Sequence, residues 1–166
     1  MYISFNISME FELHGVKLKY EDGNVYRLYH LKKGDEWKKI KYNYRSDGYI
    51  QLRFAVDKNI FIVKVHRLVY WLHNPKWDIF NSSRDNAIDH INGIRDDNHI
   101  ENLRLVTQQQ NNWNRTHTKG CSWSKEKQKW CAYIRVNKKL KHLGVFELEE
   151  DAHQAYLDAK EIYHII

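Results

Sequence analysis

An acid and an imidazole stand next to each other at Asp89 and His90, and the amide of Asn111 follows further along the chain. Carboxylate and amide oxygens suit a hard divalent cation such as Mg²⁺ or Mn²⁺. An imidazole titrates near neutral pH, so it suits the activation of water as a general base. A divalent cation polarises a phosphate and stabilises the leaving oxygen. These residues therefore predict phosphodiester hydrolysis with one metal and one base.

Two strands and one helix must bring these side chains together. Asn92-Gly93 opens a tight connection after the first strand, and Thr107 suits the N-cap of a helix. Side chains alternate along a strand, so Asp89 and His90 point to opposite sides. The predicted elements are a strand over 87–91, a strand over 103–106 and a helix from Thr107 to about Arg115.

The same region carries a longer pattern. Its matching residues are Asp89-His90, Asn98, Glu101-Asn102-Leu103 and Asn111, with Val65-His66-Arg67-Leu68-Val69 upstream. The pattern resembles the HNH endonucleases of the ββα-metal class, in the variant whose last histidine is replaced by asparagine. The upstream segment resembles the one that precedes the motif in phage and intron-borne members. The resemblance covers about residues 65–115.

The resemblance implies a role for each matching residue. His90 is the general base, and Asp89 and Asn111 are the metal ligands. Asn102 is grouped with the catalytic residues because it holds the loop and orients the base, and Asn98 braces the same loop. The family's products imply 5′-phosphate and 3′-hydroxyl ends.

Two residues upstream of the motif are separate candidates. His66 has apolar neighbours, so we expect it to brace the catalytic loop from the core. Arg67 is a candidate contact to a DNA phosphate. Both belong to a short helix predicted over 65–72, which ends before Asn74-Pro75.

Residues 1–65 are β-rich and contain no evident catalytic cluster. Val16–Tyr20 and Val25–Leu28 alternate apolar and polar residues on either side of a turn at 21–24, which predicts a hairpin. Two further strands are predicted over 49–54 and 60–65. This part is expected to form a small antiparallel sheet.

The net charge of +6 is unevenly distributed along the chain. Residues 113–144 carry +8 and three tryptophans, whereas residues 145–166 carry −5. A basic, tryptophan-containing segment suits a polyanion. From composition alone, a solvated lysine face explains the segment equally well.

The C-terminal segment is predicted to form three short strands, over 121–124, 129–136 and 140–143, and an amphipathic helix over 149–162. Its matching residues are Lys119–Trp123, Lys129–Val136, His142–Phe146 and Glu149–Ala159. They resemble the APETALA/ethylene-response type of DNA-binding domain, which implies a three-stranded antiparallel sheet packed on one helix, with the outer face of the sheet on DNA. The expected DNA contacts of the chain are Arg67, Arg115, Trp123, Lys125, Lys129, Tyr133, Arg135 and Lys141.

The chain is not expected to carry a structural zinc ion. Cys121 and Cys131 are the only cysteines, and with His117 and His142 they match no finger spacing. Two reduced thiols are the simpler interpretation. The sequence also shows no signal peptide and no transmembrane segment, so no membrane partner is expected. We expect a cytoplasmic protein in a bacterial or phage-infected cell.

The predicted protein is an α+β DNA endonuclease. The expected domains are 1–116, the nuclease with its β-rich region, and 117–166, the DNA-binding sheet and helix. A homing-type enzyme acting on double-stranded DNA is the first hypothesis, with a homodimer if both strands are cut. A restriction endonuclease, a non-catalytic DNA-binding regulator, or a protein that binds or cuts RNA are the alternatives.

Overall fold

The computed structural model describes residues 8–115 and 118–166, and it confirms the α+β class. Contacts divide the chain into two compact units. The first contains residues 1–82 and 90–105, and the second contains 83–89 and 106–166. Each unit is described by itself below. The domain boundary predicted at 116–117 lies outside the described residues.

The first unit begins with a four-stranded antiparallel sheet in the order β1-β2-β3-β4. Asp22 and Gly23 both have positive φ, which is the backbone of a two-residue hairpin turn. This turn confirms the hairpin predicted from the sequence. The strands are β1 (Met9–Leu13), β2 (Val16–Glu21), β3 (Asn24–Leu31) and β4 (Gly34–Lys39).

A second antiparallel sheet follows in the same unit, in the order β5-β6-β7. Its buried residues Leu52, Phe54 and Val63 share one hydrophobic core with Leu18 and Val25 of the first sheet. Alternate residues of β6 are buried, as expected for a sheet with one covered face. The strands are β5 (Tyr42–Tyr44), β6 (Ile50–Val56) and β7 (Asn59–Lys64).

Helix α1 (Val65–His73) follows β7 directly and confirms the short helix predicted there. Its residues Val65, His66, Leu68 and Val69 are buried, which is the one-sided pattern of a helix packed on a core. The helix ends at Asn74, before Pro75. Proline disfavours helical backbone in the residue that precedes it, so the chain turns there.

The segment predicted to carry the chemistry forms β8 (Ala87–His90), the short 3₁₀ helix η1 (Ile100–Asn102), β9 (Leu103–Val106) and α2 (Gln108–Trp113). β8 and β9 form a two-stranded sheet. Thr107 caps α2 reciprocally: its hydroxyl accepts from the Gln110 amide, and the Gln110 side-chain oxygen accepts from the Thr107 amide. Such a box satisfies two backbone donors that the helix leaves without partners.

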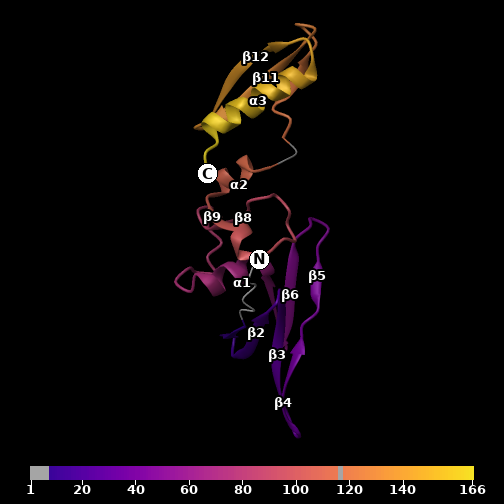
Figure 1. Ribbon diagram of the computed structural model, residues 1–166, viewed down its shortest axis with the longest axis vertical. Helices are drawn as coiled ribbons and strands as arrows, with labels where there is room; N and C mark the ends of the chain where they lie inside the picture. Colours follow the sequence, from indigo (N-terminus) through magenta and orange to yellow (C-terminus); the bar gives the residue numbers. More distant parts are fainter. Residues whose placement is uncertain (1–7, 116–117) are drawn as a thin grey trace, which may run out of the picture. The chain divides into compact units, whose positions relative to one another are not determined.

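The end of the second unit is a three-stranded antiparallel sheet with one helix, as predicted. Figure 1 shows α3 lying along β11 and β12. Ile134 packs with Tyr156 and Ala159 of α3 in a small core. Three acidic residues occupy the first turn of α3, where the helix dipole favours negative charge. The elements are β10 (Cys121–Ser124), β11 (Lys129–Val136), β12 (Lys139–Phe146) and α3 (Glu149–Tyr163).

Candidate active site

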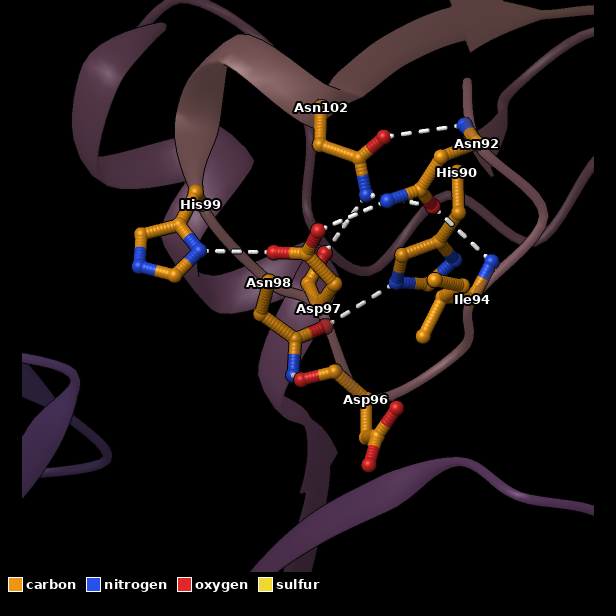
Figure 2. Close-up of polar contacts among 8 residues, drawn as sticks. All are labelled: His90, Asn92, Ile94, Asp96, Asp97, Asn98, His99 and Asn102. Atoms are coloured by element: carbon orange, nitrogen blue, oxygen red, sulfur yellow. Dashed lines mark hydrogen bonds and ion pairs between the residues drawn. The ribbon is translucent and has the colours of Figure 1, made fainter.

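The loop after β8 is built on asparagine side chains. The Asn102 amide nitrogen donates to the Asn92 side-chain oxygen at 3.0 Å and to the Asp97 carbonyl at 2.8 Å. The Asn102 side-chain oxygen accepts from the Asn92 backbone amide at 3.0 Å. One side chain thus joins the two ends of the loop (Figure 2). The side-chain contacts of Asn102 given above are all with the loop, which fits the predicted role of holding it.

Within this loop, Asn98 determines which nitrogen of His90 carries the proton. The Asn98 amide nitrogen donates to the Asp96 carbonyl at 3.2 Å, so the amide oxygen turns toward His90. That oxygen lies 3.0 Å from His90 Nε2, as Figure 2 shows. An amide oxygen only accepts, so Nε2 must donate. In the neutral ring, Nδ1 is then the basic nitrogen.

Aromatic side chains surround the buried His90 ring in the first unit. The ring centroids of His66 and Tyr49 lie 5.1 Å and 5.9 Å from that of His90. His66 is only 4% exposed, and burial is the main reason that its pKa lies well below the ordinary value, with His90, Lys64 and Arg67 adding to the shift. A neutral His66 next to His90 fits the predicted bracing role.

Asp89, the proposed metal ligand, is buried in the second unit at 5% exposure. The amide nitrogen of Asn114, just after α2, donates to its carboxylate at 3.2 Å. Asn111 lies on α2 and is half-buried. The sequence predicts Asn111 of α2 as the second ligand, and the structure shows Asn114 in contact with the carboxylate.

The donor chemistry around Asp89 fits a hard divalent cation. Within residues 8–115 and 118–166, no three His, Cys, Asp or Glu side chains form a metal-binding cluster. Mg²⁺ retains several waters and is held by one or two carboxylates together with substrate phosphates. The buried Asp89 carboxylate is a hard oxygen ligand of the kind that such a cation takes from a protein.

Arg67 is half-buried and contacts the segment that follows α1. Its guanidinium donates to the Ile79 carbonyl at 2.6 Å and to the Asn81 carbonyl at 2.8 Å. It also lies over the Trp77 ring, 4.6 Å from the centroid. These contacts fasten the segment after α1 to the helix. These contacts give Arg67 a structural role, and the DNA contact expected from the sequence stays a prediction.

Comparison with known proteins agrees with the pattern around His90. Residues 63–113 match the family model described as HNH endonuclease. We call this range the HNH segment. It contains both proposed metal ligands, the proposed base and the asparagine-rich loop.

Two further similarities extend beyond the HNH segment. Protein 3.8 of Escherichia phage T7 is 29% identical over 100 residues, which are 55% of this chain and 83% of that protein. A solved structure titled "DNA binding and cleavage by the HNH homing endonuclease I-HmuI" is 24% identical, covers 81% of this chain and 76% of its own, and has a TM-score of 0.47.

Outside the HNH segment, the register of the C-terminal sheet separates the predicted DNA contacts onto two faces. Trp123 lies opposite Trp130, and the two ring centroids are 5.6 Å apart. Alternation along β11 places Trp130 on the face that Ile134 shares with α3. By the same alternation, Tyr133 and Arg135 lie on the opposite face.

The predicted basic contacts differ in how they are held. Lys141 donates to the Tyr163 hydroxyl of α3 and lies over its ring, so its ammonium belongs to the helix side of the sheet. Lys129 pairs with Glu147 at 2.6 Å in an exposed bridge, which contributes little to stability. Lys125 and Arg115 are exposed. Lys141 is also exposed, and its expected role on DNA stays a prediction.

The remaining expectations concern cysteines and membranes. Cys121 and Cys131 are both free thiols, and Cys131 is buried. His117, which a zinc site would need, lies outside the described residues. No helix among the described residues is long and apolar enough to cross a membrane.

Sequence analysis missed several residues of the site. Asn92 was recognised only as a turn residue, yet its side chain contacts Asn102, Asp97 and Ile94. The Asn-Gly pair signals such a turn but not these partners. Asn114 and Tyr49 are far in sequence from the residues they contact, and no local signal marks them.

Proposed function

We propose that this chain is a metal-dependent DNA endonuclease in which His90 is the general base. The observation that carries this proposal is the hydrogen bond from His90 Nε2 to the Asn98 side-chain oxygen. Asn98 lies in the loop after β8, whose two ends are joined by the side chain of Asn102. A ring held with one nitrogen protonated and the other basic is prepared to accept a proton. The match of residues 63–113 to the HNH endonuclease model supports the same reaction.

In this proposal the chain's own residues move one proton. Nδ1 of His90 accepts a proton from the attacking water, and the water oxygen forms a bond to phosphorus. The bond from phosphorus to the 3′-oxygen breaks on the opposite side, and that oxygen takes a proton from solvent, which yields a 5′-phosphate and a 3′-hydroxyl. The positive ring is stabilised because Nε2–H already donates to the Asn98 oxygen.

We propose that Asp89 and Asn111 hold the cation, either Mg²⁺ or Mn²⁺. The cation would polarise the phosphate and stabilise the leaving oxygen. The Asn114 amide fixes the Asp89 carboxylate by donating to one oxygen, which limits its rotation. Both ligands and Asn114 belong to the second unit, and Asp89 is joined to His90 by one peptide bond.

The proposed substrate is double-stranded DNA. Residues 117–166 form the proposed DNA-binding domain and 1–116 the nuclease domain. Tyr133 and Arg135 share the sheet face opposite α3, and with the exposed Lys125 they remain our candidate contacts. Trp123, Lys129 and Arg115 stay candidates on exposure and charge alone. We propose that the chain is a homing-type endonuclease. Its similarity to a phage protein supports action inside an infected cell.

A supercoiled-plasmid assay tests the proposal. Cleavage is measured with Mg²⁺, with Mn²⁺, with EDTA and with His90→Ala, and plasmids carrying varied phage DNA supply target sites. The exposed His30→Ala is the matched control. Cleavage that requires the cation and is lost only in His90→Ala supports the endonuclease.

The other outcomes favour the alternatives. Retention of uncut DNA in a gel shift, with no cleavage of any plasmid, supports the non-catalytic DNA-binding regulator. Competition by single-stranded RNA in place of duplex DNA supports an RNA-directed protein. Cleavage at one short recurring sequence supports a restriction enzyme.

A further inference from the structure

Two cations lie over one aromatic ring in the first unit, next to His90. Lys64 Nζ is 4.8 Å and Arg95 Cζ is 5.2 Å from the centroid of the Tyr49 ring. The same ring lies 5.9 Å from that of His90. Lys64 ends β7, Arg95 belongs to the loop after β8, and Tyr49 precedes β6, so three separate segments supply this group.

Each cation is oriented by the protein without an ion pair to an acid. Arg95 Nη1 donates to the Asp47 carbonyl at 2.6 Å, which holds the guanidinium against the ring. The Asp47 carboxylate is itself bound by Arg45 at 3.0 Å. Among the residues that the structure describes, no carboxylate lies within ion-pair distance of Lys64 or Arg95. Both therefore keep donors for an external anion.

Partial burial makes this positive charge costly without a ligand. Lys64 is half-buried, and desolvation lowers the pKa of its ammonium, with Arg45 and Arg67 adding to the shift and the Asp47 carboxylate opposing it. An anion that arrives at this position relieves that cost, because opposite charge favours the charged form. An aromatic ring that holds both cations also reduces the entropy lost when they bind a ligand.

We propose that Lys64 and Arg95, seated on Tyr49, bind a backbone phosphate of the cleaved DNA strand next to His90. The inference rests on the proposed function, since it takes its ligand from the substrate of that reaction. Arg offers a planar fork for two phosphate oxygens, and Lys adds a point charge. Anchoring the strand beside the base would hold the phosphodiester in line for attack.

The test measures DNA binding separately from cleavage. Anisotropy of a short fluorescein-labelled duplex of mixed sequence is recorded in EDTA over a series of NaCl concentrations. We compare the full-length wild type with Lys64→Gln and Arg95→Gln. Lys17→Gln and Arg53→Gln remove the same charges at exposed positions of β2 and β6. Circular dichroism verifies that each variant is folded.

Each site variant should bind the duplex roughly tenfold more weakly than the wild type. The slope of the logarithm of the binding constant against the logarithm of the salt concentration should decrease in magnitude by about 0.9 for each phosphate that is no longer neutralised. The control variants should change the slope less. Tyr49→Leu should weaken DNA binding in the same way, because it removes the aromatic ring on which both cations lie. Tyr49→Phe keeps an aromatic ring and should preserve binding. Slopes equal to those of the controls would overturn the inference.

A plasmid assay on the same variants separates this inference from the proposed function. If the wild type cleaves and the site variants bind like the controls, the phosphate site is wrong and the endonuclease stands. If no protein cleaves but the site variants lose binding as expected, the phosphate site stands and the endonuclease is wrong.

Discussion

At the residue scale, the amide of Asn98 selects the chemistry available to His90. Its nitrogen is occupied by the Asp96 carbonyl, so its oxygen must face the imidazole. A reversed amide would present a donor to Nε2 and place the basic lone pair on the wrong nitrogen. The orientation of one side chain, held by one backbone carbonyl, therefore determines which ring nitrogen carries the proton, and in our proposal the other nitrogen is the base.

We predict that Asn98→Ala lowers the rate of plasmid cleavage about ten- to a hundredfold without weakening DNA binding, because the ring loses the partner that fixes its tautomer. Single-turnover rates and gel-shift affinities measure the two effects. The exposed Asn43→Ala, on β5, is the control. A variant that loses binding and retains its cleavage rate would contradict this role.

A second residue-scale prediction concerns His66. Burial lowers its pKa, so the unfolded chain binds this proton more readily than the folded one. At pH values above the unfolded pKa of about 6.5, His66 should not reduce the free energy of unfolding. As the pH is lowered below that value, the free energy of unfolding should decrease by at most about 1.4 kcal/mol per pH unit. Urea unfolding across this range measures the slope. His66→Gln should flatten it and His30→Gln should not; equal slopes would exclude His66 as the source.

At the element scale, the start of the C-terminal sheet depends on the absence of a side chain. Gly120 has φ +68°, and a Cβ atom there would lie 1.9 Å from Cγ of Tyr156. Its carbonyl accepts from the Tyr133 amide at 2.8 Å, so the backbone cannot simply move away. The close approach joins the chain before β10 to both β11 and α3.

Gly120→Ala should therefore lower the free energy of unfolding. The loss should be about 1–3 kcal/mol larger than for a glycine-to-alanine substitution at a position that also has positive φ but has open space around the added Cβ. Gly15→Ala supplies that comparison, since Gly15 has φ +74° and no atom within 4 Å of its added Cβ. Thermal and urea unfolding of both variants give the difference. Equal losses would mean that Tyr156 moves aside without cost.

Local signals explain which elements the sequence could predict. The Asp22-Gly23 turn, the Thr107 cap and the alternation of β11 each depend on neighbours a few residues apart, and each was found. The contacts that sequence reasoning missed join distant segments. Arg67 reaches Ile79, and Tyr49 reaches His90, through packing that no short window contains.

The same reasoning applies to the faces of the C-terminal sheet. Tyr133 and Arg135 are two residues apart on one strand, so alternation alone places them on one face, whereas the pairing of Trp123 with Trp130 required the register between strands. Lys141 was expected on DNA because of its charge, and its contact with Tyr163 depends on how α3 packs. The charge of a segment indicates that some face of it is exposed to solvent. Strand register and helix packing decide which side chains lie on that face.

At the scale of the whole molecule, each chain supplies one His90 and one Asp89. In the proposed reaction, one such site would cut one strand at a time. We predict that open-circular plasmid accumulates before linear plasmid, in a time course resolved on agarose gels. Linear product without an open-circular intermediate would instead indicate two sites acting together, and sedimentation of the protein in the absence of DNA would then show a dimer.

The asparagine loop also has a bearing on how the protein ages. Asn-Gly pairs deamidate when the glycine nitrogen attacks the asparagine side chain through a five-membered succinimide. Here the Gly93 nitrogen donates to the His90 carbonyl at 2.9 Å, and the Asn92 amide is bonded to Asp97 and Asn102. Folding thus restrains both reactants. The rate of deamidation at Asn92, measured from the mass of the peptide that contains it, should therefore increase when the loop after β8 opens more often.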